Sequence, residues 1–415
     1  MSNYVKLLDI VSQITSGATP ESGSARYYTE DDGIKFAKTE DLSASKSRYI
    51  EETGLKVKEI ALRETSLKIY PKDTILVSMY GTIGLTKIVK EPLAANQALC
   101  ALIPPFKCDI EYLYYYLTSL KSEWTRLSAQ TTQANINGEI VKNKEIWLPE
   151  LSKQKEIAKI LTKIDGCIET SNSTLDKLQN IKAGLLNDLL TRGVDSQGNL
   201  RPGYEDAPDL YQETGLGFIP KEWEIIKLDE ISEKVTDGTH QAVTTIPLNH
   251  EGVPFLFVSC VKEGKILWNK AGKISRRDYQ ELSKGREPKK GMIIYTVVGS
   301  YGDAAALADD REVAFQRNTA CIYPNTKLIS SDFLVSYLNS ESVRKHADRV
   351  ALGNAQKLIT LGELKKYLVA LPPLQEQKLI EEKLKVVTDN ISFEKENLDK
   401  LMLIKTGLLK DLLQN

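Results

Sequence analysis

An internal repeat is the feature that most constrains the fold of this chain. Residues 176–190 read DKLQNIKAGLLNDLL and residues 399–413 read DKLMLIKTGLLKDLL, so eleven of fifteen positions are identical at an offset of 223. Shorter matches continue upstream, such as Gly81-x-x-Gly84 with Gly299-x-x-Gly302. A repeat of this size in a chain of 415 residues predicts two similar structural units rather than one large core.

Each half joins a divergent front portion to a well-matched tail. Different front portions suggest two different targets, whereas equal tails suggest a shared mechanical role; the alternative is that the tails diverge slowly because they pack on each other. Residues 191–221 are rich in glycine and proline, which is typical of a linker. The expected divisions are a first domain at 1–149, a spacer helix at 150–192, a linker at 193–221, a second domain at 222–372 and a second helix at 373–415.

The tails carry the pattern of long paired helices. Their apolar residues recur at alternating steps of four and three, which is a heptad pattern. Polar residues interrupt it at matching places, Ser171 with Glu394 and Lys182 with Lys405. We expect two antiparallel helices that act as a rigid spacer; the alternative is helices buried in ordinary cores. The predicted contact positions are Ile157, Leu161, Ile164, Leu178, Leu185, Leu189, Ile380, Leu384, Val387, Leu401, Leu408 and Leu412.

The front portions have the pattern of mixed α/β domains. Short β-branched runs such as 74–78 and 292–296 predict strands. One amphipathic helix per half is expected, at 110–127 and 331–350. The predicted class is α+β, with two mixed α/β domains, two long antiparallel coiled-coil helices and an internal pseudo-two-fold repeat.

Two loop clusters in each half have residue types that can contact a chain of phosphate groups. Residues 15–19 and 236–240 combine hydroxyl side chains with glycine, which lets a backbone approach a phosphate closely. Residues 46–48 and 262–265 are basic, as phosphate contacts are. The alternatives are a tight turn for the first cluster and solvated surface charge for the second.

Two further clusters follow in each half. Residues 80–84 and 299–302 resemble a phosphate-binding loop but lack its Gly-Lys-Ser/Thr ending, so a turn between strands is the better interpretation. Residues 130–137 and 354–357 offer amide side chains, which can pair bidentately with adenine, or else cap turns. The candidate contact residues of all four clusters are Thr15, Ser16, Gly17, Thr19, Lys46, Arg48, Thr82, Thr132, Gln133 and Asn135 in the first half, and Thr236, Gly238, Thr239, His240, Lys262, Lys265, Ser300, Asn354, Gln356 and Lys357 in the second.

Composition narrows the class of protein. The five cysteines form no Cys-x-x-Cys pair and the three histidines have no ligand spacing, so we expect no metal and a reducing, cytoplasmic location. There is no apolar run of eighteen residues, so we expect no membrane span, and the N-terminus lacks a basic flank followed by an apolar stretch, so we expect no signal peptide. The net charge of −1 fits poorly with a freely sliding DNA-binding protein, although it permits local basic patches.

The sequence lacks the parts that catalysis on a nucleic acid would need. The segment Ile103-Pro104-Pro105-Phe106 approaches the motif of adenine methyltransferases but lacks the amide residue that would bind the flipped base. No glycine-rich cofactor fingerprint and no P-loop is present, so we expect a non-catalytic protein without a cofactor. A coiled-coil scaffold with two protein-binding heads is the alternative function.

Several motifs together resemble the specificity (HsdS) subunits of type I restriction–modification systems. They are SGATP at 16–20, TQANINGEIVKNKEIWLP at 132–149, LPPLQEQKLI at 371–380, GFIPKEWEIIKL at 217–228, and the two tails. The residues ELSKQ after Pro149 depart from the family pattern of a second proline and a glutamate. The resemblance implies two target-recognition domains that each read half of a split site on double-stranded DNA. It also implies helices that bind two methyltransferase (modification) subunits, with restriction subunits joining the full complex.

Overall fold

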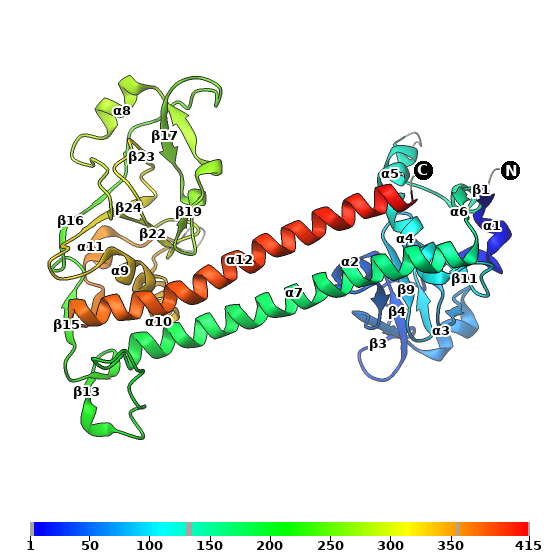
Figure 1. Cartoon of the computed structure of the whole chain (residues 1–415), viewed down its shortest axis with the longest axis horizontal. Coiled ribbons are helices and arrows are strands. Elements are labelled where there is room, and N and C mark those ends of the chain that lie inside the picture. The colour runs from blue at the N-terminus through cyan, green and yellow to red at the C-terminus, as the bar shows by residue number, and fades with distance from the viewer. Residues whose placement is uncertain (1–3, 130–134, 354–356, 414–415) are drawn as a thin grey trace. The chain divides into compact units, whose positions relative to one another are not determined.

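The computed structural model describes residues 4–129, 135–353 and 357–413 (Figure 1). The chain divides into two compact units, residues 1–175 with 393–415, and residues 176–392. Each unit holds one globular domain and one segment of each of two long helices, α7 (Leu151–Thr191) and α12 (Leu374–Leu413). The predicted class, two mixed α/β domains with two long helices, is confirmed.

Two sheets form the domain of the first unit. Their strands are short apolar runs bounded by turn residues, as the sequence pattern predicted. The first sheet has the order β2 (Gln13–Ser16), β11 (Leu99–Ile103), β8 (Ile75–Ser78), β9 (Thr86–Val89), β5 (Tyr49–Ile50). The second has the order β3 (Tyr28–Thr29), β6 (Leu55–Val57), β4 (Ile34–Ala37), β10 (Leu93–Ala95), β7 (Ile69–Tyr70).

The domain of the second unit repeats this plan with fewer strands. Its main sheet has the order β16 (Ser232–Asp237), β24 (Thr319–Pro324), β21 (Ile293–Thr296), β22 (Ala304–Ala306). The smaller sheet has the order β20 (Gly272–Ile274), β17 (Val253–Leu256), β23 (Ala314–Phe315), and β18 (Val261–Lys262) forms a hairpin with β19 (Lys265–Ile266). A pair of strands closes the base of each domain, β1 (Tyr4–Lys6) with β12 (Glu145–Trp147) and β15 (Glu224–Lys227) with β25 (Leu368–Leu371).

The single helix expected in each half is a pair of helices, which corrects the prediction. Residues 110–128 form α4 (Ile110–Ser119) and α5 (Lys121–Ser128), and residues 331–350 form α9 (Ser331–Leu338) and α10 (Glu341–Val350). In the second unit the break has a clear cause, because Ser340 is extended and its side chain caps α10 by accepting from Val343 N. The shorter helices are α1 (Leu7–Ile10), α2 (Thr39–Ala44), α3 (Glu59–Glu64), α6 (Gly138–Lys142), α8 (Arg276–Leu282) and α11 (Leu361–Lys365), with 3-10 turns at Pro208–Leu210, Val258–Cys260 and Trp268–Lys270.

Within each unit the segments of α7 and α12 run antiparallel. In the first unit, Ser171 donates to Glu394, and Lys405 Nζ lies 2.6 Å from Asp165 Oδ1. The ends of the heptad pattern pack into the domain cores, and its middle is less buried. Ile157, Leu161, Leu189, Ile380 and Leu384 are buried, whereas Ile164, Leu178, Leu185, Val387, Leu401, Leu408 and Leu412 are partly buried.

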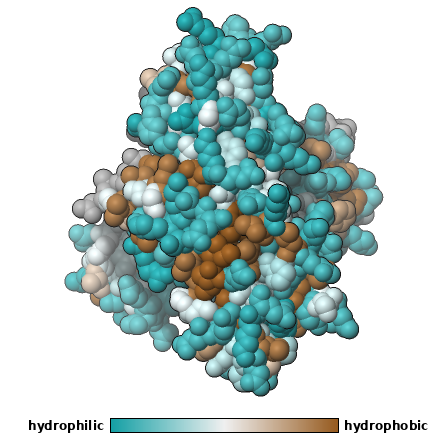
Figure 2. Space-filling model, turned by 90° about the vertical axis from the view of Figure 1, so that its left-hand side faces the viewer, coloured by the Kyte–Doolittle hydropathy of each residue, from teal (hydrophilic) through white to brown (hydrophobic). Residues whose placement is uncertain are grey.

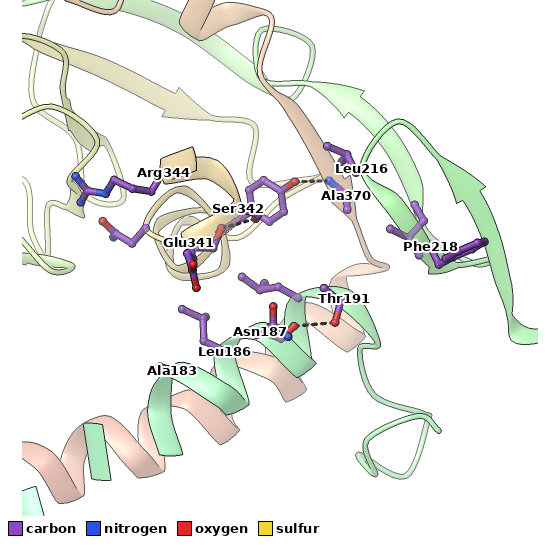
Figure 3. Close-up of a pocket in the computed structure, with 15 residues that line it drawn as sticks. Ala183, Leu186, Asn187, Thr191, Leu216, Phe218, Glu341, Ser342, Arg344 and Ala370 are labelled. Atoms are coloured by element: carbon purple, nitrogen blue, oxygen red, sulfur yellow. Dashed lines mark hydrogen bonds between the residues drawn. The ribbon is translucent and has the colours of Figure 1, made fainter. Parts of the chain in front are cut away.

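The segment expected as a linker folds onto the second unit. It contains a hairpin, β13 (Tyr211–Thr214) with β14 (Gly217–Pro220). The buried carboxylate of Glu376, in the first turn of α12, holds this segment in place: it accepts from Val194 N at 2.9 Å and Trp223 Nε1 at 3.1 Å, and it pairs with Arg201. The hairpin, α7 and the start of α10 line a groove of about 330 Å³, whose lining residues include Leu186, Phe218 and Ser342 (Figure 3).

The surface of the molecule is largely polar. Figure 2 shows one face that is mostly hydrophilic, with apolar side chains gathered in a patch near its middle. Exposed apolar residues of the second unit include Leu328 at 40% and Leu216 at 42%. Within the ranges that the structure describes, no helix is both long and apolar enough to span a membrane.

Candidate nucleic-acid interface

Strand register brings the predicted clusters to one end of the main sheet in each unit. In the first unit the end of β2 pairs with the start of β11, Ser16 opposite Cys100, and the end of β8 pairs there too, Ser78 opposite Leu99. In the second unit Asp237 lies opposite Ala320 in the same way. The loops that follow β2 and β8, and those that follow β16 and β21, therefore open at equivalent ends.

The first cluster sits against a neighbouring turn so closely that it requires glycine. A Cβ on Gly17 would lie 2.1 Å from Asn96 O, and a Cβ on Gly238 would lie 2.2 Å from Gln316 O. Thr15, Gly17 and Thr236 are half-buried, Thr239 is buried, and Ser16, Thr19 and His240 are exposed. The His240 ring contacts the Asp237 carboxylate. Two different domains thus use the same close approach, which explains the repeated glycine.

The third cluster is the turn between strands that the sequence favoured. It joins β8 to β9 and β21 to β22, with Gly84 N donating to Ser78 O and Gly302 N donating to Thr296 O, both at 2.9 Å. Gly84 and Gly302 have φ of 78° and 89°, the left-handed region that favours glycine. The tip residues Thr82 and Ser300 are exposed.

The fourth cluster lies beside the third. Ile136 N donates to Met79 O at 3.2 Å, and Gly299 N donates to Lys357 O at 3.2 Å. Asn135 is half-buried and Lys357 is exposed. The predicted contact residues Thr132, Gln133, Asn354 and Gln356 lie outside the described residues.

The second cluster lies at the opposite edge of the sheet, beside the long helices. Lys46 is exposed, whereas Arg48 Nε lies 3.0 Å from Glu111 Oε2, which neutralises its charge. The Lys87 ammonium donates to the carbonyls of Ser45 and Ser47 and so fixes this segment. Burial lowers the pKa of Lys87 to about 8.

In the second unit, the second cluster also lies at the far edge of the main sheet, beside the long helices. Lys262 and Lys265 lie on the β18–β19 hairpin, beside the edge strand β22, and Lys262 is exposed. Lys265 Nζ lies 3.4 Å from Ser392 Oγ on α12. Strands are about 4.8 Å apart, so the first and second clusters are separated by three to four strand spacings, on the order of 15–20 Å.

Sequence analysis missed the turns that the first cluster packs against. These turns are residues 95–98 and 315–318, and they carry the exposed side chains Gln97 and Arg317. Arg286 was also missed; its Nε donates to Asp237 O at 2.7 Å, which places a guanidinium beside the first cluster of the second unit. The repeated pattern of two apolar residues followed by two amide or basic residues was a signal, but only strand pairing brings these distant segments to the clusters.

The described residues of the candidate site offer hydrogen-bond donors and cations. Among the described residues, no group of three or more His, Cys, Asp or Glu side chains could hold a metal ion. The Ile103–Phe106 segment begins at the other end of β11, where Ile103 pairs with Gln13.

Comparison with known proteins identifies the family. The family model for the type I restriction modification DNA specificity domain matches residues 2–180 and 220–403. The chain is 30% identical over 319 residues to the type I restriction enzyme MjaVIII specificity subunit of Methanocaldococcus jannaschii, covering 73% of this chain and 71% of that relative. It is 24% identical to the EcoBI specificity subunit of Escherichia coli, covering 74% and 65%.

Solved structures agree with this result at the level of the fold. The S subunit of a type I restriction–modification system from M. genitalium superposes with a TM-score of 0.55 at 16% identity, over 99% of this chain and 96% of that one. A type I system structure described for complex assembly and conformational transition gives a TM-score of 0.56 at 15% identity, with the same coverage. With its family model matched once in each half, this chain belongs to the type I restriction–modification DNA specificity family.

Proposed function

We propose that this chain is the DNA-recognition subunit of a type I restriction–modification complex, and that each unit reads one half of a split DNA site. The observation that carries the proposal is the shared loop end of the two main sheets. Both units present the same backbone framework there, with different side chains on it. A common framework with different tips suits two half-sites of different sequence.

The residue types at the loop end of each main sheet suit contacts to DNA through hydrogen bonds and through charge. Exposed Ser16, Thr82 and Ser300 can donate to phosphate oxygens, and the basic Lys46, Lys262 and Lys357 supply charge. Gly17 and Gly238 bring their loops close to the neighbouring turns. The net charge of −1 means that the attraction to phosphate is local, and that partner subunits contribute to it.

The helices offer two similar surfaces for a methyltransferase subunit. Ile181 is 55% exposed and its repeat equivalent Ile404 is 51% exposed. One turn further on, Gly184 and Gly407 both have open space where a Cβ would be. Two copies of one partner, related by the internal repeat, would find the same apolar residue and the same small residue. Restriction subunits would join this assembly in the full complex.

The proposal assigns no catalysis to this chain. We expect the purified chain alone neither to methylate nor to cut DNA, and methylation to appear when a methyltransferase subunit and S-adenosylmethionine are added. Sequencing the methylated sites should then give two fixed half-sites around an unspecified spacer. Methyl transfer by the chain alone, or methylation without any shared sequence, would contradict the proposal.

The alternative function, a scaffold with two protein-binding heads, predicts a different result when DNA binding is measured without methylation. Binding of the assembled complex to a randomised duplex library enriches a bipartite sequence under the DNA-recognition proposal. A scaffold would enrich no sequence, and its DNA binding would depend on salt alone.

A further inference from the structure

The turns at residues 95–98 and 315–318 are held by the same set of backbone hydrogen bonds. Asn96 N donates to Ala37 O and Gln316 N donates to Leu256 O, both at 3.0 Å. The turns close through Leu99 N to Asn96 O at 3.1 Å, and through Thr319 N to Gln316 O at 3.0 Å. Each turn is thus fixed to the smaller sheet on one side and to its own strand on the other.

The first cluster and the third cluster complete the frame around each turn. Gly17 N donates to Leu99 O and Gly238 N donates to Thr319 O, both at 3.0 Å. From the other side, Met79 N donates to Ala98 O at 2.8 Å and Val297 N donates to Asn318 O at 3.0 Å. The third residue of each turn is therefore presented from a rigid frame, between two loops assigned above to the DNA surface.

The tip of this frame is Gln97 in the first unit and Arg317 in the second. Both side chains are exposed, and neither has a hydrogen bond or ion pair to any residue that the structure describes. Burial along the two segments is also the same, with buried residues before the turn and after it. The tips differ in chemistry, whereas the backbone hydrogen bonds named above are the same in both turns.

We propose that Gln97 and Arg317 are equivalent base-reading residues, and that they direct the first unit toward adenine and the second toward guanine at the matching position of each half-site. This inference rests on the proposed DNA-recognition function. The amide of glutamine donates to adenine N7 and accepts from its N6 amino group, whereas the arginine fork donates twice, to guanine N7 and O6. A free side chain on a fixed turn loses little conformational freedom in the backbone when it binds.

Exchanging the two tips tests the inference. Arg317→Gln and Gln97→Arg are made separately in the chain, expressed with its methyltransferase subunit, and the methylated sites are sequenced. Arg317→Gln should lower the preference for guanine at one position of one half-site by about 5- to 150-fold, the range for one bidentate pair, and favour adenine there. Gln97→Arg should make the reverse change in the other half-site.

Matched controls separate base reading from charge. Arg277→Gln removes an exposed arginine from α8 of the same unit, and Gln13→Arg adds one at the far end of β2, opposite Ile103. Both should leave the recognised sequence unchanged. Arg317→Gln overturns the inference if guanine preference is unchanged, or if binding weakens equally for all sequences, as loss of a phosphate contact does. A parental complex without any preferred sequence would instead contradict the proposed function.

Discussion

The two units share a backbone framework and differ in where they bury charge. In the first unit the charge lies where the domain meets the long helices, with Asp165 accepting from Tyr115 Oη at 2.8 Å and pairing with Lys405. In the second it lies at the start of α12, where Glu376 holds Arg201 and Trp223. The sheet ends, by contrast, are joined by equal backbone hydrogen bonds in both units.

The repeat equivalents show that these charged clusters are not shared. Lys153 occupies the position of Glu376, and it is exposed. Thr388 occupies the position of Asp165. Backbone hydrogen bonds can stay the same when side chains change, because every residue except proline has both a backbone donor and a backbone acceptor. A buried ion pair, by contrast, is lost when either of its two charged side chains is replaced. The loop ends of the two main sheets are therefore alike in their backbone hydrogen bonds, whereas each unit has a different buried ion pair at the long helices.

Removing the anchor of the second unit should have the largest effect. Glu376→Ala leaves Arg201 buried without its main partner and removes the acceptor of Val194 N and Trp223 Nε1, so the free energy of unfolding of this unit should fall by about 3–5 kcal/mol. Hydrogen exchange resolved by unit measures it. Lys153→Ala, at the equivalent position, should change stability by no more than about 0.5 kcal/mol. Equal losses from both substitutions would show that Lys153 anchors the first unit as Glu376 anchors the second.

Adding a Cβ at the close approach tests the shared framework. Gly17→Ala and Gly238→Ala should each destabilise their own unit by about 1–3 kcal/mol, because the new atom meets a backbone carbonyl that cannot move freely. Sequence selectivity should fall at the half-site of that unit alone. Gly215→Ala, where a Cβ has open space, is the control. Unchanged melting of either variant would mean that the two loops are not held as described.

The helices should also reveal an asymmetry between the units. Beside the equivalent Ile404 and Ile181, the first unit exposes Met402 and Leu403 where the second has Gln179 and Asn180. If the proposed partner docks there, the first-unit site should be tighter by about 1–2 kcal/mol through extra apolar burial. Titration followed by native mass spectrometry should give two affinities. The double substitution of Met402→Gln with Leu403→Asn should make them equal, and equal affinities in the parental chain would contradict the prediction.

The smallest expected effect is a gain in stability that is the same in both units. Gly184 and Gly407 lie inside helices with open space around a built Cβ. Replacing either with alanine should raise the free energy of unfolding by about 0.5–1 kcal/mol, because alanine loses less backbone entropy than glycine in a helix. Denaturant melting of the free chain measures it. A loss of stability at one position only would indicate a close contact in that unit alone.

The repeat made much of this fold predictable. Matching tails predicted helices at 150–192 and 373–415, and α7 and α12 run from Leu151 to Thr191 and from Leu374 to Leu413, since an apolar residue every three or four positions records which face is covered. The helix breaks at Leu120 and at Asn339–Ser340 were missed: a capping serine inside an apolar pattern looks like an ordinary polar position, and Leu120 fits the apolar pattern of the helix. Of the candidate site, the sequence singled out the glycine loops, and the close approach at Gly17 and Gly238 gives those glycines a steric reason. Gln97 and Arg317 were not found, because only long-range strand pairing places their turns beside those loops.

The hydrogen bond from Ser171 to Glu394 has a consequence for how the two halves recognise each other. These residues are equivalent in the repeat, so they meet where a local two-fold axis would pass between the helices. Were each half a separate chain, two copies of the second would place one carboxylate against another, and two copies of the first would place one hydroxyl against another. Only the mixed pair joins a donor to a charged acceptor. At this symmetric position, a difference of one side chain between the repeats thus makes the two halves complementary.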